Sequence, residues 1–340
     1  MPSKEDEYKY MVCTRCVTYN HDCYIRETME GFVMQRTSFP VVHVIADDAS
    51  TDNTVKVIRE FLDDNFDLNE ESVAYEKETD FAFVIFARHK TNRNCFFVVM
   101  LLKENHYSQK KPKRPYFSEW TAQAKYHAVC EGDDYWTDPQ KLQIQVDFLE
   151  SHPEYSMCFH AVEDVSPDGS KRLDSRYQKD MELCPIDDFF KVGGGYAPTC
   201  SLLYRGSLFE PKPTFFNKTR VSDSPLILTM FLRGKVSFFS RIMGCYRVNV
   251  PGSWSQRQKH LGFRQIIEKF KAGRAYWEEV DKYTQGVYSK QIRQRKRHVT
   301  SRRNNNFRAI FLPDSITFLE QSPIGGQVAS MGHIFLTTFF

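Results

Sequence analysis

Among the pairs of adjacent aspartates in the sequence, Asp47-Asp48 directly follows an apolar stretch, and Asp133-Asp134 follows one after Glu131-Gly132. Neighbouring carboxylates repel each other, and a hard divalent cation placed between them and a diphosphate relieves that repulsion. The functional interpretation of the second pair is therefore a clamp for Mg²⁺ or Mn²⁺ and a diphosphate. An acid of the first pair is suited to accept hydrogen bonds from a base or a ribose. The alternative for both pairs is a solvated turn whose acids only cap a helix.

Both pairs stand at the ends of predicted strands. Residues 41–46 and 125–130 combine β-branched, aromatic and small side chains, which is typical of strands. A strand is also predicted within residues 8–18, and apolar side chains then recur at helical spacing over 25–33. Strands that alternate with helices are expected to run parallel, and ligands of such sheets bind outside the carboxyl ends of the strands. We therefore expect the acids to meet at one edge of a sheet.

Helices are expected directly after the two acidic turns. Ser50 precedes helix-spaced apolar residues at 55–62 and is predicted to cap that helix. Thr137 or Asp138 is predicted to cap the second helix, whose first residue would be Pro139.

Two further polar sites are candidates for function. Residues 103–114 form a basic loop containing Asn105, which we interpret as a solvated loop or as a set of donors for a phosphate. Asp223 opens a predicted helix, where it is either the helix cap, the interpretation that its position favours, or a catalytic carboxylate.

Composition limits the class of protein. The chain has 340 residues, 41% of them hydrophobic, so it can bury a sizeable core, and a formal net charge of +3 gives no reason to expect a nucleic-acid partner. Nine scattered cysteines favour reduced thiols over a disulfide framework. The start of the chain lacks the apolar core of a signal peptide, and no stretch approaches the roughly 20 apolar residues of a membrane span. A cytoplasmic location is expected.

Three motifs in order, Thr18-Tyr19-Asn20, Asp47–Asp52 and Glu131–Trp136, resemble those of bacterial family 2 glycosyltransferases of the GT-A fold. The resemblance covers about residues 9–255, and the continuation Trp136–Leu142 is similar to a subgroup that builds bacterial surface polysaccharides. It implies an α/β, GT-A (Rossmann-like) fold, in which helices flank a mixed, mainly parallel sheet and a helical extension follows at the C-terminus.

The resemblance also implies a domain organisation. Residues 1–255 would form the glycosyltransferase domain, with a nucleotide-binding half at about 9–140 and an acceptor half at about 141–255. Residues 256–297 are expected to form an amphipathic helical extension, and the tail at 298–340 receives no role.

The family implies roles for individual residues. Asp48 would accept from the nucleotide base, and Asp133 would lie near the ribose. Asp134 would be the direct metal ligand for Mn²⁺ or Mg²⁺. The residues expected to bind the nucleotide sugar are Val17, Thr18, Tyr19, Asn20, Asp47, Asp48, Asn105 and Asp133.

Asp223 matches the placement of the family's general base, although Ser222 precedes it where the family has Gly or Glu. Such a base deprotonates an acceptor hydroxyl for in-line attack on the anomeric carbon, so an inverting reaction is expected. The expected donor is a nucleotide-diphosphate sugar, with a UDP-sugar favoured, and the expected acceptor is a saccharide or a lipid-linked saccharide.

Two other classes stay open. Acidic pairs at strand ends also serve metal-dependent phosphohydrolases and nucleotidyltransferases, and a chain that keeps the clamp without a base would be a non-catalytic nucleotide-sugar binder. The basic residues near 290–303 favour either a peripheral contact with the inner face of a membrane or a solvated surface.

Overall fold

The computed structural model describes residues 8–69, 74–112, 114–219, 223–251, 253, 256–257 and 261–296. The described residues form two compact units. The sheet unit comprises residues 8–184, 197–211 and 230–250, and the helical unit comprises residues 185–196, 212–229 and 251–296. The tail that the sequence places at 298–340 lies outside the described residues.

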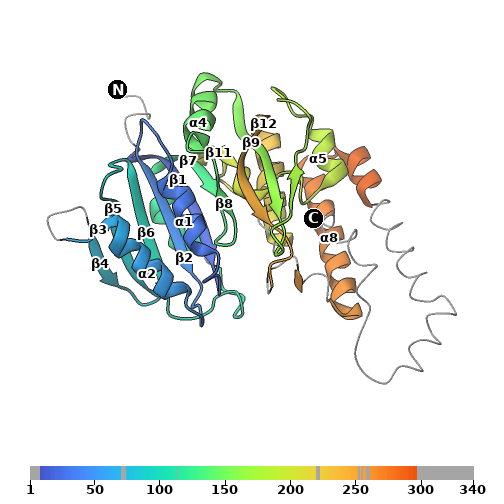
Figure 1. Cartoon of the computed structure of the whole chain (residues 1–340). Coiled ribbons are helices and arrows are strands. Elements are labelled where there is room, and N and C mark those ends of the chain that lie inside the picture. The colour runs from blue at the N-terminus through green and yellow to red at the C-terminus, as the bar shows by residue number, and fades with distance from the viewer. Residues whose placement is uncertain are drawn as a thin grey trace. The chain divides into compact units, whose positions relative to one another are not determined.

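The sheet unit is built around a mixed β-sheet, whose strand order is β3-β5-β6-β2-β1-β7-β11-β9-β12-β8 (Figure 1). The four central strands β6, β2, β1 and β7 run parallel, and β5 and β11 join their two sides antiparallel. Strand β10 pairs with β9, and β4 pairs with β5. The strands are β1 (Tyr10–Thr18), β2 (Val41–Asp47), β3 (Phe66–Asp67), β4 (Tyr75–Glu78), β5 (Ala82–His89), β6 (Cys95–Leu102), β7 (Ala124–Val129), β8 (Tyr135–Trp136), β9 (Tyr155–Val165), β10 (Lys171–Asp174), β11 (Leu203–Arg205) and β12 (Lys235–Arg247).

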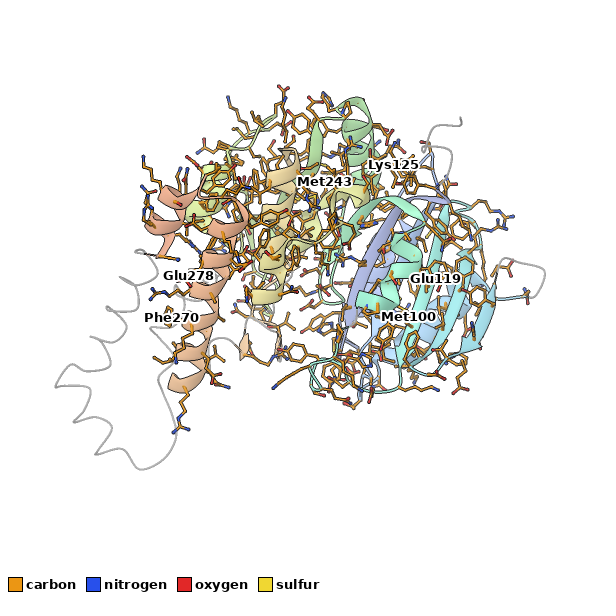
Figure 2. The ribbon with its side chains drawn as sticks, turned by 180° about the vertical axis from the view of Figure 1, so that it is seen from behind. Met100, Glu119, Lys125, Met243, Phe270 and Glu278 are labelled. Carbon is orange, nitrogen blue, oxygen red and sulfur yellow. The ribbon has the colours of Figure 1, made fainter. Side chains whose placement is uncertain are left out.

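Helices cover both faces of the parallel strands. Helices α1 (Ile25–Val33) and α2 (Thr54–Asn65) lie on the face toward the viewer in Figure 1. Helix α3 (Arg114–Thr121), which carries Glu119, lies on the opposite face in Figure 2. The apolar residues of α1 and α2 pack in one cluster and those of α3 in another, because alternate strand residues point to opposite faces. Helix α4 (Lys141–Ser151) follows the second acidic turn.

Two predicted helix starts are wrong by several residues. Helix α2 begins at Thr54, and its first N–H is accepted by the Asp52 carboxylate at 2.9 Å, so Ser50 is not its cap. Helix α4 begins at Lys141, two residues after the predicted Pro139, although Asp138 does accept from the N–H of Gln140, as a cap before Pro139 would. In both turns the chain makes extra bends around the acids before a helix begins, which local capping preferences do not encode.

The helical unit contains α5 (Ile186–Val192), the 3₁₀ turn η4 (Thr214–Lys218), α6 (Asp223–Arg233) up to Thr229, and α8 (Phe263–Tyr283). Aromatic rings hold it together. Phe215 contacts the ring of Tyr276 on α8 with centroids 5.9 Å apart, and Phe190 contacts Trp277 at 5.8 Å. The short turns η2 (Thr199–Ser201) and η3 (Gly206–Leu208) belong to the sheet unit.

The predicted fold class is confirmed: helices flank a mixed sheet whose centre is parallel. All nine cysteines are free thiols, as the sequence predicted. No helix in the described part of the chain has both the length and the apolar composition needed to cross a bilayer.

Candidate active site

The two aspartate pairs meet at one edge of the sheet because their strands flank the same strand. Strand β1 pairs in parallel with β2, with Thr18 opposite Asp47, and on its other side with β7. The N–H of Asp48 donates to the carbonyl oxygen of Thr18 at 2.9 Å, and the N–H of Gly132 donates to that of Val17 at 2.9 Å. These bonds join three segments into one edge.

The loop after β1 is fastened to the loop after β2 by Asn20. Its Oδ1 accepts from the N–H of Thr51 at 2.8 Å, and its own N–H donates to the hydroxyl of Ser50 at 2.9 Å. The backbone of Asn20 is left-handed, with φ 55°, a conformation that asparagine tolerates better than most residues. The loop that contains the exposed Tyr19 therefore has a defined shape.

Asp47 shapes its own loop. One carboxylate oxygen accepts from the N–H of Ser50 at 3.0 Å, and the other accepts from the Ser50 hydroxyl. Burial raises the pKa of this carboxyl above its usual value, and the bonds from Ser50 oppose that rise. Since Ser50 also accepts from Asn20, Asp47 supports the Asn20 loop indirectly.

Asp48 reaches in the other direction, to the turn after β6. Its two oxygens accept from the backbone N–H groups of His106 and Tyr107 at 2.9 and 3.1 Å. Asn105 shapes the same turn, because its side-chain oxygen accepts from the N–H of Ser108 at 2.7 Å. The structure thus brings the predicted residue Asn105 next to Asp48 and shows that Asp48 anchors this turn.

The acidic turn itself is held against the end of β1. The carboxylate of Glu131 accepts from the N–H of Val17 at 3.2 Å. Gly132 lies so close to β1 that a Cβ atom on it would stand 2.5 Å from both Cβ and Oγ1 of Thr18. The hydroxyl of Thr28 on α1 lies 3.1 and 2.7 Å from the carbonyl oxygens of Gly132 and Asp134.

The two aspartates of this turn have different environments. The carboxylate of Asp133 is partly exposed, and its Oδ2 lies 4.0 Å from Nε2 of His21. Asp134 is buried, and one of its oxygens accepts from the backbone N–H of Arg247 at 2.8 Å. Burial, together with the neighbouring Asp133, raises the pKa of Asp134 well above its usual range.

Carboxyl groups like those of the acidic turn are the ligands that a hard divalent cation prefers. Glu131, Asp133 and Asp134 place three carboxyl groups within four residues, and in the described part of the chain no cationic side chain is bonded to the buried carboxyl of Asp134. The described residues hold no group of three or more His, Cys, Asp and Glu arranged to bind a metal. Mg²⁺ in phosphate sites is usually bound by one or two carboxylates, with substrate phosphates completing its shell, so the residues present are compatible with such a site.

Asp223 belongs to the helical unit and is the first residue of α6. Burial raises the pKa of its carboxyl above the usual value. Asp223 lies within the first turn of α6, and both the capping and the catalytic interpretation stay predictions.

The structure thus joins eight predicted residues at one edge: Val17, Thr18, Tyr19, Asn20, Asp47, Asp48, Asn105 and Asp133, with Asp134 buried directly behind. Sequence reasoning missed His21, Thr28 and Arg247, which contact the acidic turn from other elements. His21 follows the Thr18–Asn20 motif directly and carried a local signal. Thr28 and Arg247 carried none, because they reach the turn through packing alone.

Comparison with known proteins identifies a fold but no family. No protein-family model matches the chain. Uncharacterised proteins of Mycobacterium tuberculosis and Mycobacterium bovis are 29% identical to it in an alignment of 247 residues that covers 70% of this chain. The chain spans 59% of the length of these curated relatives.

Solved structures of S. aureus TarS share the fold. Residues 1–349 of TarS in complex with UDP-GlcNAc match with a TM-score of 0.54 and 15% identity, over 80% of this chain and 66% of that one. The same fragment with UDP matches with a TM-score of 0.52 and 12% identity, over 94% of both chains. At this identity the likeness establishes the fold.

Proposed function

We propose that this chain is a glycosyltransferase that transfers a sugar from a nucleotide-diphosphate sugar to a saccharide or lipid-linked acceptor. The observation that carries the proposal is the edge where two acidic turns, Asp47-Asp48 and Glu131–Asp134, are bonded to the same strand β1. A shared fold with TarS, which was solved with UDP-GlcNAc and with UDP, supports a uridine diphosphate donor.

The proposed nucleotide site consists of the loop at residues 17–20 and the turn at 105–107. Both are fixed by hydrogen bonds within the protein, Asn20 to Thr51 and Asp48 to the backbone of the turn. A site that is formed before its ligand arrives loses less conformational entropy on binding. The partly exposed Asp133 then stands where a ribose or a diphosphate can reach it.

The proposed clamp consists of Asp133 and Asp134. A bound Mn²⁺ or Mg²⁺ supplies Lewis-acid neutralisation of the charge that develops on the departing diphosphate. Asp134, one oxygen of which accepts from the N–H of Arg247, would hold the cation together with Asp133. Burial raises the pKa of Asp134, and a bound cation would favour its ionised form.

Asp223 is proposed as the general base of an inverting transfer. Its raised pKa makes the carboxylate a stronger base than an exposed aspartate. We also propose a role in surface-polysaccharide synthesis and a division into nucleotide and acceptor halves, both on the basis of the resemblance to family 2 glycosyltransferases. The basic residues near 290–303 are the basis for proposing a contact with the inner face of a membrane.

A panel of nucleotide sugars tests the donor. The midpoint of thermal unfolding is measured with UDP-, GDP-, CDP- and dTDP-sugars, with and without Mn²⁺. A ligand at 100 times its Kd stabilises the folded state by about 2.7 kcal/mol. We expect Mn²⁺-dependent stabilisation by UDP-sugars in the wild type and its loss in Asp134→Asn and Asp133→Asn. Stabilisation by no nucleotide sugar refutes the clamp.

Turnover separates the remaining classes. With a bound donor, we expect transfer to a saccharide or lipid-linked acceptor, and we expect Asp223→Asn to keep donor binding while losing transfer. Unchanged transfer in that variant removes Asp223 from the base role. Binding without transfer by the wild type identifies a nucleotide-sugar binder, and cleavage of a phosphate bond without an acceptor identifies a phosphohydrolase.

A further inference from the structure

We propose that Arg247 is a positioning residue that holds the acidic turn in the shape required by the metal and diphosphate clamp. This inference rests on the proposed function. Arg247 is the last residue of β12 and lies 113 positions along the chain from Asp134. The two residues are brought together by the sheet, because β12 pairs in antiparallel fashion with β8, which directly follows the acidic turn.

Arg247 makes two hydrogen bonds to the turn. Its backbone N–H donates to one carboxylate oxygen of Asp134 at 2.8 Å. Its Nη1 donates to the backbone carbonyl oxygen of Asp133 at 2.6 Å. One bond fixes a side chain and the other fixes the backbone, so the turn is held at two successive residues.

The positive charge of the same guanidinium is directed elsewhere. Its Nη2 pairs with the carboxylate of Glu27 on α1. Its central carbon lies 4.9 Å from the ring centroid of Tyr24 and 4.5 Å from that of Tyr135, within the range of cation–π attraction. Since the guanidinium bonds to the carbonyl of Asp133 and not to either aspartate side chain, the acids are positioned without an ion pair that would compete with a metal.

The turn needs such support because of its own charge. Glu131, Asp133 and Asp134 repel one another across four residues, and Asp134 is buried. Helix α1 supports the turn twice, directly through the hydroxyl of Thr28 and indirectly through Glu27 and Arg247. Loss of the guanidinium would remove the hydrogen bond to the carbonyl oxygen of Asp133. The free energy needed to bring the carboxylates together around a cation would then rise.

Binding of UDP with and without Mn²⁺, compared with binding of uridine alone, tests this role in the full-length protein. In Arg247→Met we expect the Mn²⁺-dependent affinity for UDP to fall about 10–100-fold, the usual effect of removing a residue that orients metal ligands. Uridine lacks the diphosphate, so its affinity should change less than about twofold. The control is Arg59→Met. Arg59 lies on α2, away from the acidic turn, and its guanidinium is 5.3 Å from the ring of Phe83.

Two further variants grade the effect. Arg247→Lys keeps the charge but loses the planar fork that serves Asp133 and Glu27 together, so we expect an intermediate loss. Glu27→Gln leaves the turn untouched and removes the partner that orients the guanidinium, and we expect a loss of about threefold or more in the Mn²⁺-dependent affinity for UDP.

The outcomes are distinguishable. The positioning role is overturned if Arg247→Met binds UDP with Mn²⁺ as tightly as the wild type does. It is also overturned if the variant loses the same factor in affinity for uridine as for UDP. Either result leaves the proposed function intact. If Arg247→Met does not fold, Glu27→Gln decides, because Glu27 is half exposed, and unchanged binding in that variant overturns the role. If the wild type itself binds UDP no better with Mn²⁺ than without it, the clamp fails and the role of Arg247 fails with it.

Discussion

Gly132 illustrates how closely the acidic turn fits the end of β1. Its N–H donates to the carbonyl oxygen of Val17, and the Thr18 side chain occupies the space where a Cβ atom would stand. A residue with any side chain would separate the turn from β1. Because Glu131 also bonds to Val17, this separation would displace the acids on both sides of the glycine.

Gly132→Ala is therefore expected to destabilise the protein by about 1–3 kcal/mol, the usual cost of forcing extra atoms into a packed site. The added Cβ atom would stand 2.5 Å from Cβ and Oγ1 of Thr18, and side-chain rotation cannot move the Cβ atom of Thr18, which is bonded to the backbone. Urea denaturation measures the change. The Mn²⁺-dependent affinity for UDP should also weaken, and unchanged stability would show that the turn can shift freely.

A second prediction at this scale concerns Asn20, which combines a left-handed backbone with a side-chain bond to Thr51. Asn20→Gly removes the bond but tolerates the backbone, whereas Asn20→Ala loses both advantages. We expect alanine to destabilise the protein by about 1 kcal/mol more than glycine does. Thermal or urea unfolding of the two variants checks this order, and equal stability would contradict the importance of the backbone conformation.

At the scale of elements, helix α1 is fitted to the strand that follows the acidic turn. A Cβ atom on Gly31 would stand 2.8 Å from the backbone nitrogen of Trp136 and 2.9 Å from its oxygen. The close approach lets Thr28, one helical turn earlier, reach the backbone of the acidic turn. A glycine within this helix thus has a packing function that outweighs its poor helix propensity.

The glycines of α1 and α8 provide a matched test. In a helix interior, alanine is favoured over glycine by about 1 kcal/mol. Among the residues that the structure describes, none has an atom within 4 Å of a Cβ atom added to Gly273 of α8, so Gly273→Ala should stabilise the protein by up to about 1 kcal/mol. Gly31→Ala should destabilise it in spite of the same propensity, because backbone atoms block the methyl group. Urea denaturation of both variants measures the two signs, and a stabilising Gly31→Ala would contradict the tight fit.

For the whole molecule, buried histidines link stability to pH. His43 is buried on β2, with its ring stacked on Phe32 at 4.6 Å between centroids. Neither ring nitrogen has a hydrogen-bond partner among the described residues. Burial, and to a lesser extent the charge of Lys141, lowers the pKa of His43 from 6.5 to about 3. The folded protein therefore keeps this ring neutral under mildly acidic conditions.

The unfolded chain protonates His43 first, because its pKa there is the ordinary 6.5. The stability contribution is complete above pH 6.5 and is lost as the pH falls toward 3. His43→Phe removes this titration while keeping the stacked ring. Between pH 7 and pH 5 we expect the wild type to lose about 2 kcal/mol more stability than the variant. Urea unfolding at the two pH values measures the difference, and parallel losses would show that His43 is not protonated on unfolding.

The sequence by itself determined the order of strands and helices around the two acidic turns and the motif resemblance that suggested the fold. These features depend on residues that are close together in the sequence. Alternation and helical spacing of apolar side chains predict the strands and helices. Acids that follow an apolar strand lie at the end of that strand. Local signals were less reliable for the starts of α2 and α4. At α2 it is Asp52, not the predicted Ser50, that accepts the first N–H of the helix, and α4 begins two residues after the predicted Pro139.

Only the tertiary structure decided what holds the acids in place. Asp48 accepts from the backbone of a turn 58 positions away, and Asp134 accepts from Arg247, 113 positions away. No local pattern encodes such contacts, since they depend on which strands become neighbours in the sheet. The close approach of Gly132 to Thr18 likewise depends on the pairing of β1 with β7. The sequence thus identified the acids, and the packing of distant strands fixed their positions, their burial and their partners.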